Sequence, residues 1–281
     1  MPPSGLEAAF RPREVDANKY SVGTVVIVGG SDQYPNAPVM AGLGARSAGA
    51  GLIQLVAPNA SRPCAGALLP EATFTELVAT FVPPRADVTV LGMGLGKAVF
   101  SELIVTRLLS GSQGRFVLDA DALAVLAQWY GKLEGYAPAA GQELVLTPHE
   151  GEAAKLLGAS RVDVSGDRSA AAREIAKRYG ATVVLKGART VVVSCDGSRL
   201  YENGTGNPVM ALGGMGDLLA GVIGARWAYL KGDAYLAAAS SVWLHGAAGD
   251  RLVASGADPS IVNTAAFIGS MRTKLDFSKE A

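Results

Sequence analysis

The sequence has few of the residues that build disulfide frameworks or metal clusters. Only two of its 281 residues are cysteines, Cys64 and Cys195, and they lie far apart and form no C-x-x-C pair. This spacing excludes a disulfide framework and the common zinc sites, and it favours a reducing cytoplasm. The two histidines are too few to build a metal cluster by themselves, and no Ser-His-Asp pattern is visible.

An excess of charge of either sign is also absent. Lysine and arginine together number 25, as do aspartate and glutamate, so the formal net charge is zero. A nucleic-acid surface would need clustered positive charge. No stretch of about 18 residues is apolar enough to span a bilayer, because the nearest candidate, 209–230, contains Asp217 and Arg226. The N-terminus carries acidic residues and lacks the apolar core of a signal peptide, so we expect a cytoplasmic protein.

Glycine, in contrast, is abundant, with 35 residues, and 49% of the chain is hydrophobic. This composition indicates a globular protein that can bury a large core. Short β-branched runs alternate with helical patterns, and clusters of glycine and aspartate follow the runs. Strands are predicted at 24–28, 52–57, 87–91, 115–118, 143–146 and 181–185, with a hairpin at 191–201.

The alternation of strands and helices predicts the fold class. It argues for a three-layer α/β/α sandwich with a mainly parallel central sheet, which binds ligands at the carboxyl ends of its strands. We assign residues 1–22 to an N-terminal extension and 23–281 to a single domain, and 58–70 has no clear pattern. Helices are predicted at 37–50, 100–109, 121–129, 147–157, 168–179, 217–230, 234–253 and 261–275.

A glycine-rich loop, 203–216, runs into an apolar helical pattern that starts at Asp217. The backbone N–H groups at a helix start have no intrahelical partner and lie at the positive end of the helix dipole. Small residues there let an anion approach the backbone. Asp217 is then either a helix cap or a base aimed at the group that reacts with a phosphate. The loop predicts an anion hole formed by Gly213, Gly214, Met215 and Gly216.

Polar residues at other strand ends allow more than one interpretation. Asp119 and Asp121 suit a magnesium ion bound through water, or ribose hydroxyls, while one of them could instead cap the next helix. His149 lies in a proline-containing turn, which favours ligand contact. His245 lies in an apolar helix and is expected to be a satisfied core residue. Thr147 is expected to cap the following helix, with the next proline at the first helical position.

Two glycine-containing turns also follow strands. Residues 92–97 fit the spacing of neither a P-loop nor a Rossmann loop, which leaves a close approach to a ligand and a plain turn as alternatives. Residues 186–190, Lys-Gly-Ala-Arg-Thr, carry two cations. They suit either nucleotide phosphate and ribose or a solvated entrance to the hairpin.

Three motifs together give the sequence a specific resemblance. They are T-P-H-E-G-E at 147–152, K-G-A-R-T at 186–190 and G-N-P-V-M-A-L-G-G-M-G-D at 206–217. In this order they resemble the ADP/ATP-dependent NAD(P)H-hydrate dehydratases of the ribokinase-like fold, from about Gly23 to the C-terminal helices. The final G-G-x-G-D alone is shared with related small-molecule kinases. The epimerase domain often fused ahead of this one is not expected, because the first predicted strand begins at Thr24.

The resemblance implies a nucleotide-dependent dehydration of the S-epimer of hydrated NAD(P)H. The ring hydroxyl would be phosphorylated by ADP or ATP, and phosphate would then be eliminated. Asp217 would be the base that activates the hydroxyl, and Ala37, Gly94 and His149 would hold the hydrated cofactor with it. Contacts to ADP or ATP are implied for Lys186, Gly187, Ala188, Arg189, Thr190 and Gly216.

The resemblance also implies Mg²⁺ on the nucleotide phosphates without direct protein ligands, a separate epimerase in the pathway, and a homo-oligomer such as a tetramer. The sequence departs from the family at Met93, Glu150 and Met215, and a glutamate near a phosphate-rich ligand is unexplained. One alternative is a ribokinase-like kinase of a vitamin precursor of the hydroxyethylthiazole or hydroxymethylpyrimidine type. Another is a non-catalytic adenine-nucleotide sensor, which would not need Asp217.

Overall fold

The computed structural model describes residues 2–96, 99–111, 113–132, 138–258, 260 and 262–271. Within these ranges a single large sheet forms the centre of the molecule. Its strands are β1 (Thr24–Val28), β2 (Leu52–Ala57), β3 (Thr73–Glu76), β4 (Val88–Leu91), β5 (Gly114–Leu118), β6 (Gln142–Leu146), β7 (Thr182–Leu185), β8 (Val191–Val193) and β9 (Leu200–Glu202).

The strand order is β3-β2-β1-β4-β5-β6-β7-β8-β9. Neighbours from β3 to β7 pair in parallel, whereas β8 and β9 add an antiparallel hairpin at one edge. The predicted mainly parallel sheet and its terminal hairpin are therefore confirmed. Because consecutive parallel strands run in one direction, the loops after β4, β5, β6 and β7 gather at one edge of the sheet.

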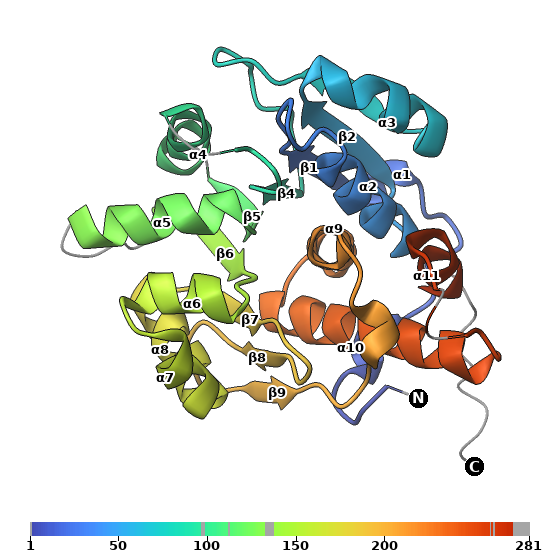
Figure 1. The fold of residues 1–281 in the computed structure, drawn as a ribbon. Coiled ribbons are helices and arrows are strands. Elements are labelled where there is room, and N and C mark those ends of the chain that lie inside the picture. Colours follow the sequence, from blue (N-terminus) through green and yellow to red (C-terminus); the bar gives the residue numbers. More distant parts are fainter. Residues whose placement is uncertain are drawn as a thin grey trace.

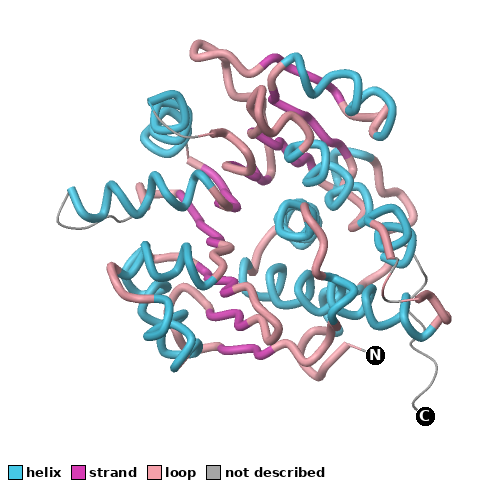
Figure 2. The backbone as a smooth tube through the Cα atoms, in the orientation of Figure 1, coloured by secondary structure: helices cyan, strands magenta, loops and turns pink. Residues whose placement is uncertain are grey.

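Helices cover both faces of the sheet and make the predicted three layers (Figure 1, Figure 2). None of the described helices is long and apolar enough to cross a membrane. One face carries α4 (Val99–Gly111), α5 (Asp121–Lys132), α6 (Glu150–Leu157), α7 (Arg161–Gly166) and α8 (Arg168–Tyr179). The other carries α2 (Ala37–Ser47), α3 (Arg62–Leu68), α9 (Met215–Leu230), α10 (Ala234–Ala254) and α11 (Thr264–Met271).

Two hydrophobic cores follow from this layering, one on each side of the sheet. All five residues of β1 are buried. Val25 and Ile27 belong to the core under α2, α9 and α10, whereas Val26 and Val28 belong to the core under α4, α5, α6 and α8. Side chains alternate between the faces of a strand, so a strand covered on both sides needs an unbroken apolar run. This requirement explains the β-branched runs in the sequence.

Two glycines bring α2 and α9 into backbone contact. A Cβ atom on Gly44 of α2 would overlap the carbonyl oxygen of Leu218 in α9. In the reverse direction, a Cβ atom on Gly221 of α9 would overlap the carbonyl oxygen of Ala41 in α2. This contact determines where α9 begins relative to the sheet.

The structure adds elements that the sequence patterns did not predict. Residues 58–70 contain the short helix α3, and β3 forms the edge of the sheet with mostly exposed side chains. Helix α7 is also additional. The last predicted helix is observed as α11, and residues 272–275 of that prediction lie outside the described residues.

The predicted helix cap at Thr147 is wrong. Helix α6 begins at Glu150, and its N-cap is His149, whose side chain accepts hydrogen bonds from the backbone of Gly151 and Glu152. A histidine Nδ1 lies two bonds from Cβ, as an aspartate oxygen does, and it satisfies two helix-start amides here. The Thr147 hydroxyl is used elsewhere, at the end of β5.

The N-terminal residues pack onto the domain. The short helix η1 (Glu7–Phe10) is held by Arg226 of α9, whose guanidinium donates to the Ala9 carbonyl and lies 4.8 Å from the centre of the Phe10 ring. The Phe10 ring in turn meets Trp243 of α10 edge to face, with ring centroids 5.3 Å apart. The second short helix, α1 (Lys19–Val22), ends directly before β1.

Gly221→Ala should destabilise the protein strongly, because its methyl group would force α9 away from α2. We expect a loss of about 3 kcal/mol in the free energy of unfolding, measured by urea denaturation followed by circular dichroism. Gly66→Ala is the matched control, since Gly66 is exposed in α3 and a Cβ atom there meets nothing within 4 Å. It should stabilise by up to about 1 kcal/mol. Equal effects of the two substitutions would contradict the proposed helix contact.

Candidate active site

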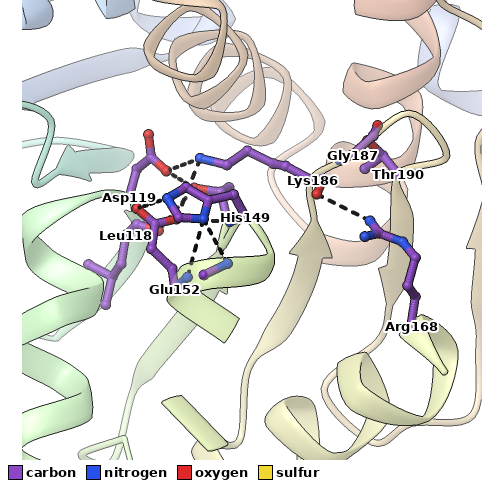
Figure 3. A network of polar contacts seen from close by, with 10 residues as sticks. Leu118, Asp119, His149, Glu152, Arg168, Lys186, Gly187 and Thr190 are labelled. Carbon is purple, nitrogen blue, oxygen red and sulfur yellow. Dashed lines mark hydrogen bonds and ion pairs between the residues drawn. The ribbon is translucent and has the colours of Figure 1, made fainter. Parts of the chain in front are cut away.

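The candidate site lies where the ends of β5 and β7 face the first turn of α9. Asp119 follows β5 and is only 2% exposed, and Lys186 follows β7. The Lys186 Nζ atom donates to the Asp119 Oδ1 atom at 2.6 Å (Figure 3). The Thr147 hydroxyl, from the end of β6, donates to the same oxygen at 2.7 Å. Three neighbouring strand ends therefore converge on one buried carboxylate.

Lys186 is a charged residue in a largely buried position. Burial lowers its pKa, but the carboxylates of Asp119 and Glu152 outweigh that effect, and the pKa lies above its ordinary value. The Lys186 Nζ atom is 3.9 Å from the Glu152 Oε2 atom. The ammonium group therefore keeps its charge and is held between two strand ends and α6.

The first turn of α9 lies directly beside this cation. Gly214 is the N-cap and has a left-handed backbone with φ of +84°, which glycine adopts without strain. A Cβ atom on Gly216 would lie 3.3 Å from Lys186 Nζ and 3.9 Å from Asp119 Oδ2. The predicted helix start after the glycine loop is thus confirmed. Unpaired amides and a cation share one small space that suits an anion.

Asp217 is the third residue of α9 and lies in the same cluster. Burial raises its pKa, the charge of Asp119 adds to this effect and Lys186 opposes both, so that the pKa lies at about 7. A carboxyl group with a pKa near neutrality can accept a proton at physiological pH, which is the property that a general base needs. This supports the interpretation of Asp217 as a base over that of a helix cap.

His149 lies next to Lys186 along the sheet edge, where the two residues form an isolated parallel bridge. Its Nδ1 atom accepts from the Gly151 amide at 2.9 Å, so the hydrogen-bond pattern assigns the proton of the neutral ring to Nε2. The Nε2 atom lies 3.4 Å from the Glu152 carboxylate. The ring borders a cavity of about 140 Å³ that Asp121 and Glu152 also line. A contact between His149 and a ligand remains a prediction.

Glu150, the residue that the sequence left unexplained, has a structural partner. Its carboxylate pairs with the guanidinium of Arg168, at the start of α8. Arg168 also donates to the backbone carbonyl of Leu185 at 2.9 Å. It donates as well to the carbonyl of Lys186 at 3.1 Å (Figure 3). Glu150 therefore orients an arginine that fixes the end of β7, and its negative charge is neutralised by that arginine.

A second cavity, of about 520 Å³, has Lys186 in its wall and is separate from the small cavity beside His149. Of the residues expected to contact a nucleotide, all but Arg189 line it; Arg189 is exposed and absent from the lining. The motif at 186–190 is therefore part of a cavity wall as well as the entrance to the hairpin. The lining residues that were expected are Lys186, Gly187, Ala188, Thr190, Met215 and Gly216.

The far wall of this cavity was missed by sequence reasoning. A Cβ atom on Gly246 of α10 would overlap Thr205, so the loop after β9 rests against the helix backbone. Asp250, one turn further along α10, accepts from the Gly206 amide at 3.0 Å and from the Asn207 side chain at 2.9 Å. The glycine and aspartate spacing within H-G-A-A-G-D at 245–250 was the available signal.

His245 is buried as expected, but it is not satisfied. Its Nε2 atom has no hydrogen-bond partner within the described part of the chain, and its ring meets Phe267 edge to face at 5.0 Å. Burial lowers its pKa to about 4, so the ring is neutral at pH 7. His245 also lines the large cavity. The expectation of a satisfied core residue is therefore wrong in this respect.

The residues expected to hold the hydrated cofactor fall into two groups. Ala37 and Gly94 are neighbours, since a Cβ atom on Gly94 would lie 2.9 Å from that of Ala37. The Gly96 amide donates to Asp121 at 2.9 Å, which ties this loop to the start of α5. His149 belongs to the other group, beside Lys186. The contact of the loop after β4 with a ligand remains a prediction.

Within the described ranges, no three His, Cys, Asp or Glu side chains are placed to hold a metal ion. The Oδ1 atom of Asp119 is already occupied by Lys186 and Thr147. Asp121 accepts from a backbone amide. The two aspartates, which the sequence allowed as indirect ligands of Mg²⁺, thus have protein partners of their own.

Known proteins share this architecture and these motifs. A bifunctional NAD(P)H-hydrate repair enzyme Nnr from Gloeobacter violaceus is 41% identical over 254 residues, which cover 86% of this chain and 47% of that protein. An ADP-dependent (S)-NAD(P)H-hydrate dehydratase from Neisseria meningitidis is 38% identical, over 86% of this chain and 81% of the relative. The chain spans about half the length of the bifunctional relatives that it matches.

A solved structure of a related protein has the same fold as this chain. The ADP/ATP-dependent NAD(P)H-hydrate dehydratase from Bacillus subtilis, co-crystallised with ATP and Mg²⁺, superposes with a TM-score of 0.83 at 27% identity and covers 95% of this chain and 93% of that one. The fold and the helix-start site define a protein of the ribokinase-like class. The sequence model of the NAD(P)H-hydrate dehydratase family matches residues 25–266, and this chain belongs to that family.

Asp217→Asn should make the protein more stable at alkaline pH. The folded-state pKa near 7 exceeds the ordinary value, so the folded protein binds more protons between about pH 4 and 7, and stability falls as the pH rises. The amide avoids ionising a buried group. We expect a gain of about 1–3 kcal/mol at pH 8 that disappears near pH 4, measured by denaturation across pH. A variant that is less stable at pH 8 would contradict the raised pKa.

Proposed function

We propose that this protein removes water from the S-epimer of hydrated NAD(P)H and so restores NAD(P)H, with ADP or ATP as the phosphoryl donor. The observation that carries the proposal is Asp217, a carboxyl group with a pKa near 7 at a helix start beside the Lys186 ammonium. Membership of the family and similarity to an ADP-dependent (S)-NAD(P)H-hydrate dehydratase support the choice of substrate.

The two cavities suggest how the substrates bind. The nucleoside of ADP or ATP would occupy the large cavity, with its phosphates directed past Lys186 to the amides of 213–216. The hydrated nicotinamide would lie nearer to His149, which borders the smaller cavity, and to the contact between Ala37 and Gly94. Asp217, next to Gly216 in the wall of the large cavity, would then act as the base for transfer to this substrate.

The chemistry uses these groups in two steps. Hydroxide is a poor leaving group, so the ring hydroxyl is first converted to a phosphate ester. Asp217 takes the hydroxyl proton, while the amides of 213–216 and the Lys186 ammonium stabilise the charge on the transferring phosphoryl group. The lone pair of the ring nitrogen then expels phosphate, and a proton leaves the neighbouring ring carbon to complete the dihydronicotinamide.

Mg²⁺ would enter as part of the nucleotide substrate. The described residues offer no cluster of metal ligands, and the Asp119 carboxylate is engaged by Lys186 and Thr147. The ion would bridge the nucleotide phosphates and neutralise part of their charge. The protein's own contribution to that charge is the helix start and Lys186.

The first test is the return of dihydronicotinamide absorbance from hydrated NADH and hydrated NADPH, with ADP, with ATP and with neither, in the presence of Mg²⁺. Nucleotide-dependent recovery is expected, and it also identifies the preferred donor and cofactor. A folded sample that gives no recovery with either nucleotide would overturn the proposal. That result would favour a kinase whose phosphorylated product is stable.

Asp217→Asn should reduce turnover by about 10²–10⁴-fold, because the amide cannot accept the hydroxyl proton. The same absorbance assay measures this, and circular dichroism checks that the variant is folded. Asp258→Asn removes an exposed carboxylate outside the site and should leave turnover unchanged. Turnover near the wild-type level in Asp217→Asn would remove Asp217 from the role of base.

The wider setting follows from the reaction. A dehydratase for one epimer needs an epimerase to recover the other, and the longer relatives are named bifunctional repair enzymes. We therefore infer a separate or fused epimerase activity as the partner in this pathway. A single domain over 23–281, a homotetramer and a cytoplasmic location stay predictions; the location rests on the scarcity of cysteine.

A further inference from the structure

The proposed reaction leaves one buried group without a role. Asp119 is the most buried carboxylate of the site, and its Oδ1 atom is shared by the Lys186 ammonium at 2.6 Å and the Thr147 hydroxyl at 2.7 Å. Its Oδ2 atom faces the first turn of α9, 3.9 Å from where a Cβ atom of Gly216 would lie. Asp119 therefore contacts the Lys186 ammonium group and lies near the first turn of α9, which carries Asp217.

Lys186 needs such a partner to stay in place. A lysine side chain is flexible, and holding it in one conformation costs entropy. Here the ammonium lies 2.6 Å from Asp119 but 3.9 Å from Glu152, so Asp119 supplies its short contact. In this conformation the ammonium group lies beside Gly216, in the first turn of α9. Without Asp119, the long side chain would be free to leave that position.

Resting on the proposed function, we propose that Asp119 is a positioning residue for phosphoryl transfer: its buried carboxylate fixes the Lys186 ammonium beside the first turn of α9 and keeps a negative charge next to Asp217. In the transfer, a P–O bond forms to the ring hydroxyl oxygen and the P–O bond to the nucleotide breaks. The hydroxyl proton moves to Asp217. Asp119 touches none of the reacting atoms.

Two charged groups act on Asp217: Asp119 from the end of β5 and Lys186 from the end of β7. Glu152 of α6 lies 3.9 Å from the Lys186 Nζ atom, and the N-cap His149 lies 3.4 Å from Glu152. Of these, Asp119 raises the pKa of Asp217 and Lys186 lowers it, after the larger effect of burial. Removing the Asp119 charge should lower the pKa of Asp217, because the like charge beside the base is then gone.

The test compares Asp119→Asn, Asp119→Glu and Asp233→Asn with the wild type. Asparagine keeps the shape of Asp119 and can accept from Thr147, but it loses the charge. Glutamate keeps the charge and displaces it by one methylene. Asp233→Asn is the matched control, because it removes the charge of an ion pair with Arg199 at the start of α10, where asparagine caps a helix as well as aspartate.

We expect Asp119→Asn to lower kcat by about 10²-fold with little change in KM for the hydrated cofactor, because a misplaced Lys186 affects the transition state. The acidic limb of the kcat/KM profile should move to lower pH by roughly one unit. Asp119→Glu should lose a similar factor in kcat and leave the limb in place. The control should resemble the wild type in both.

Two kinetic results would overturn the proposal. One is wild-type kcat in Asp119→Asn, or in Asp119→Glu should the first variant fail to fold. The other is a loss of kcat in Asp119→Asn with an unmoved acidic limb, which indicates a merely structural role. A ¹³C NMR titration of the Asp217 carboxyl, assigned by its absence in Asp217→Asn, needs no turnover. If the wild type restores no NAD(P)H, the proposed function fails, and an unchanged Asp217 titration in Asp119→Asn separately overturns the role of Asp119.

Discussion

The contact between the backbones of α2 and α9 is the constraint on which the site depends. Because Gly44 and Gly221 have no side chain, each helix lies against a carbonyl oxygen of the other. Interiors are packed as densely as organic crystals, so this contact leaves α9 little freedom to shift along its axis. The N-terminal end of α9 therefore stays level with the carboxyl ends of β5 and β7. Without the contact between α2 and α9, the helix start and the strand ends would still exist, but they would not be held next to each other.

The site where α9 meets the strand ends contains more negative than positive side chains. One ammonium group, Lys186, lies among the carboxylates of Asp119, Glu152 and Asp217. A buried ion pair contributes little net stability, because desolvation offsets the attraction, so its presence in this structure is better explained by the site than by folding. An incoming phosphoryl group would supply the negative charge that the helix start lacks. Arg168, paired with Glu150, keeps the end of β7 fixed while this happens.

Much of this arrangement was predictable from local sequence, and the rest was not, for physical reasons. Buried strands such as β1 need unbroken apolar runs, so the sheet and the helix start at Asp217 could be read directly. Strand β3 lies at the edge with exposed side chains and leaves no such pattern. The pair of Asp119 and Lys186 depends on strand order, which places β6 between their strands and brings residues 67 apart in sequence together. The cap at His149 was missed because a histidine replaces the usual oxygen ligand.

The division of the two cores bears on how the chain folds as it is synthesised. The core under α4, α5, α6 and α8 uses segments that follow one another closely, so it can form as those residues emerge. The other core joins β1 and α2 to α9 and α10, nearly two hundred residues later. Until α9 and α10 emerge, α2 and α3 cover this face of the sheet only in part, and its apolar side chains stay open to chaperones or to aggregation. Truncation within α10 would therefore remove the wall of the large cavity and leave an adhesive apolar surface.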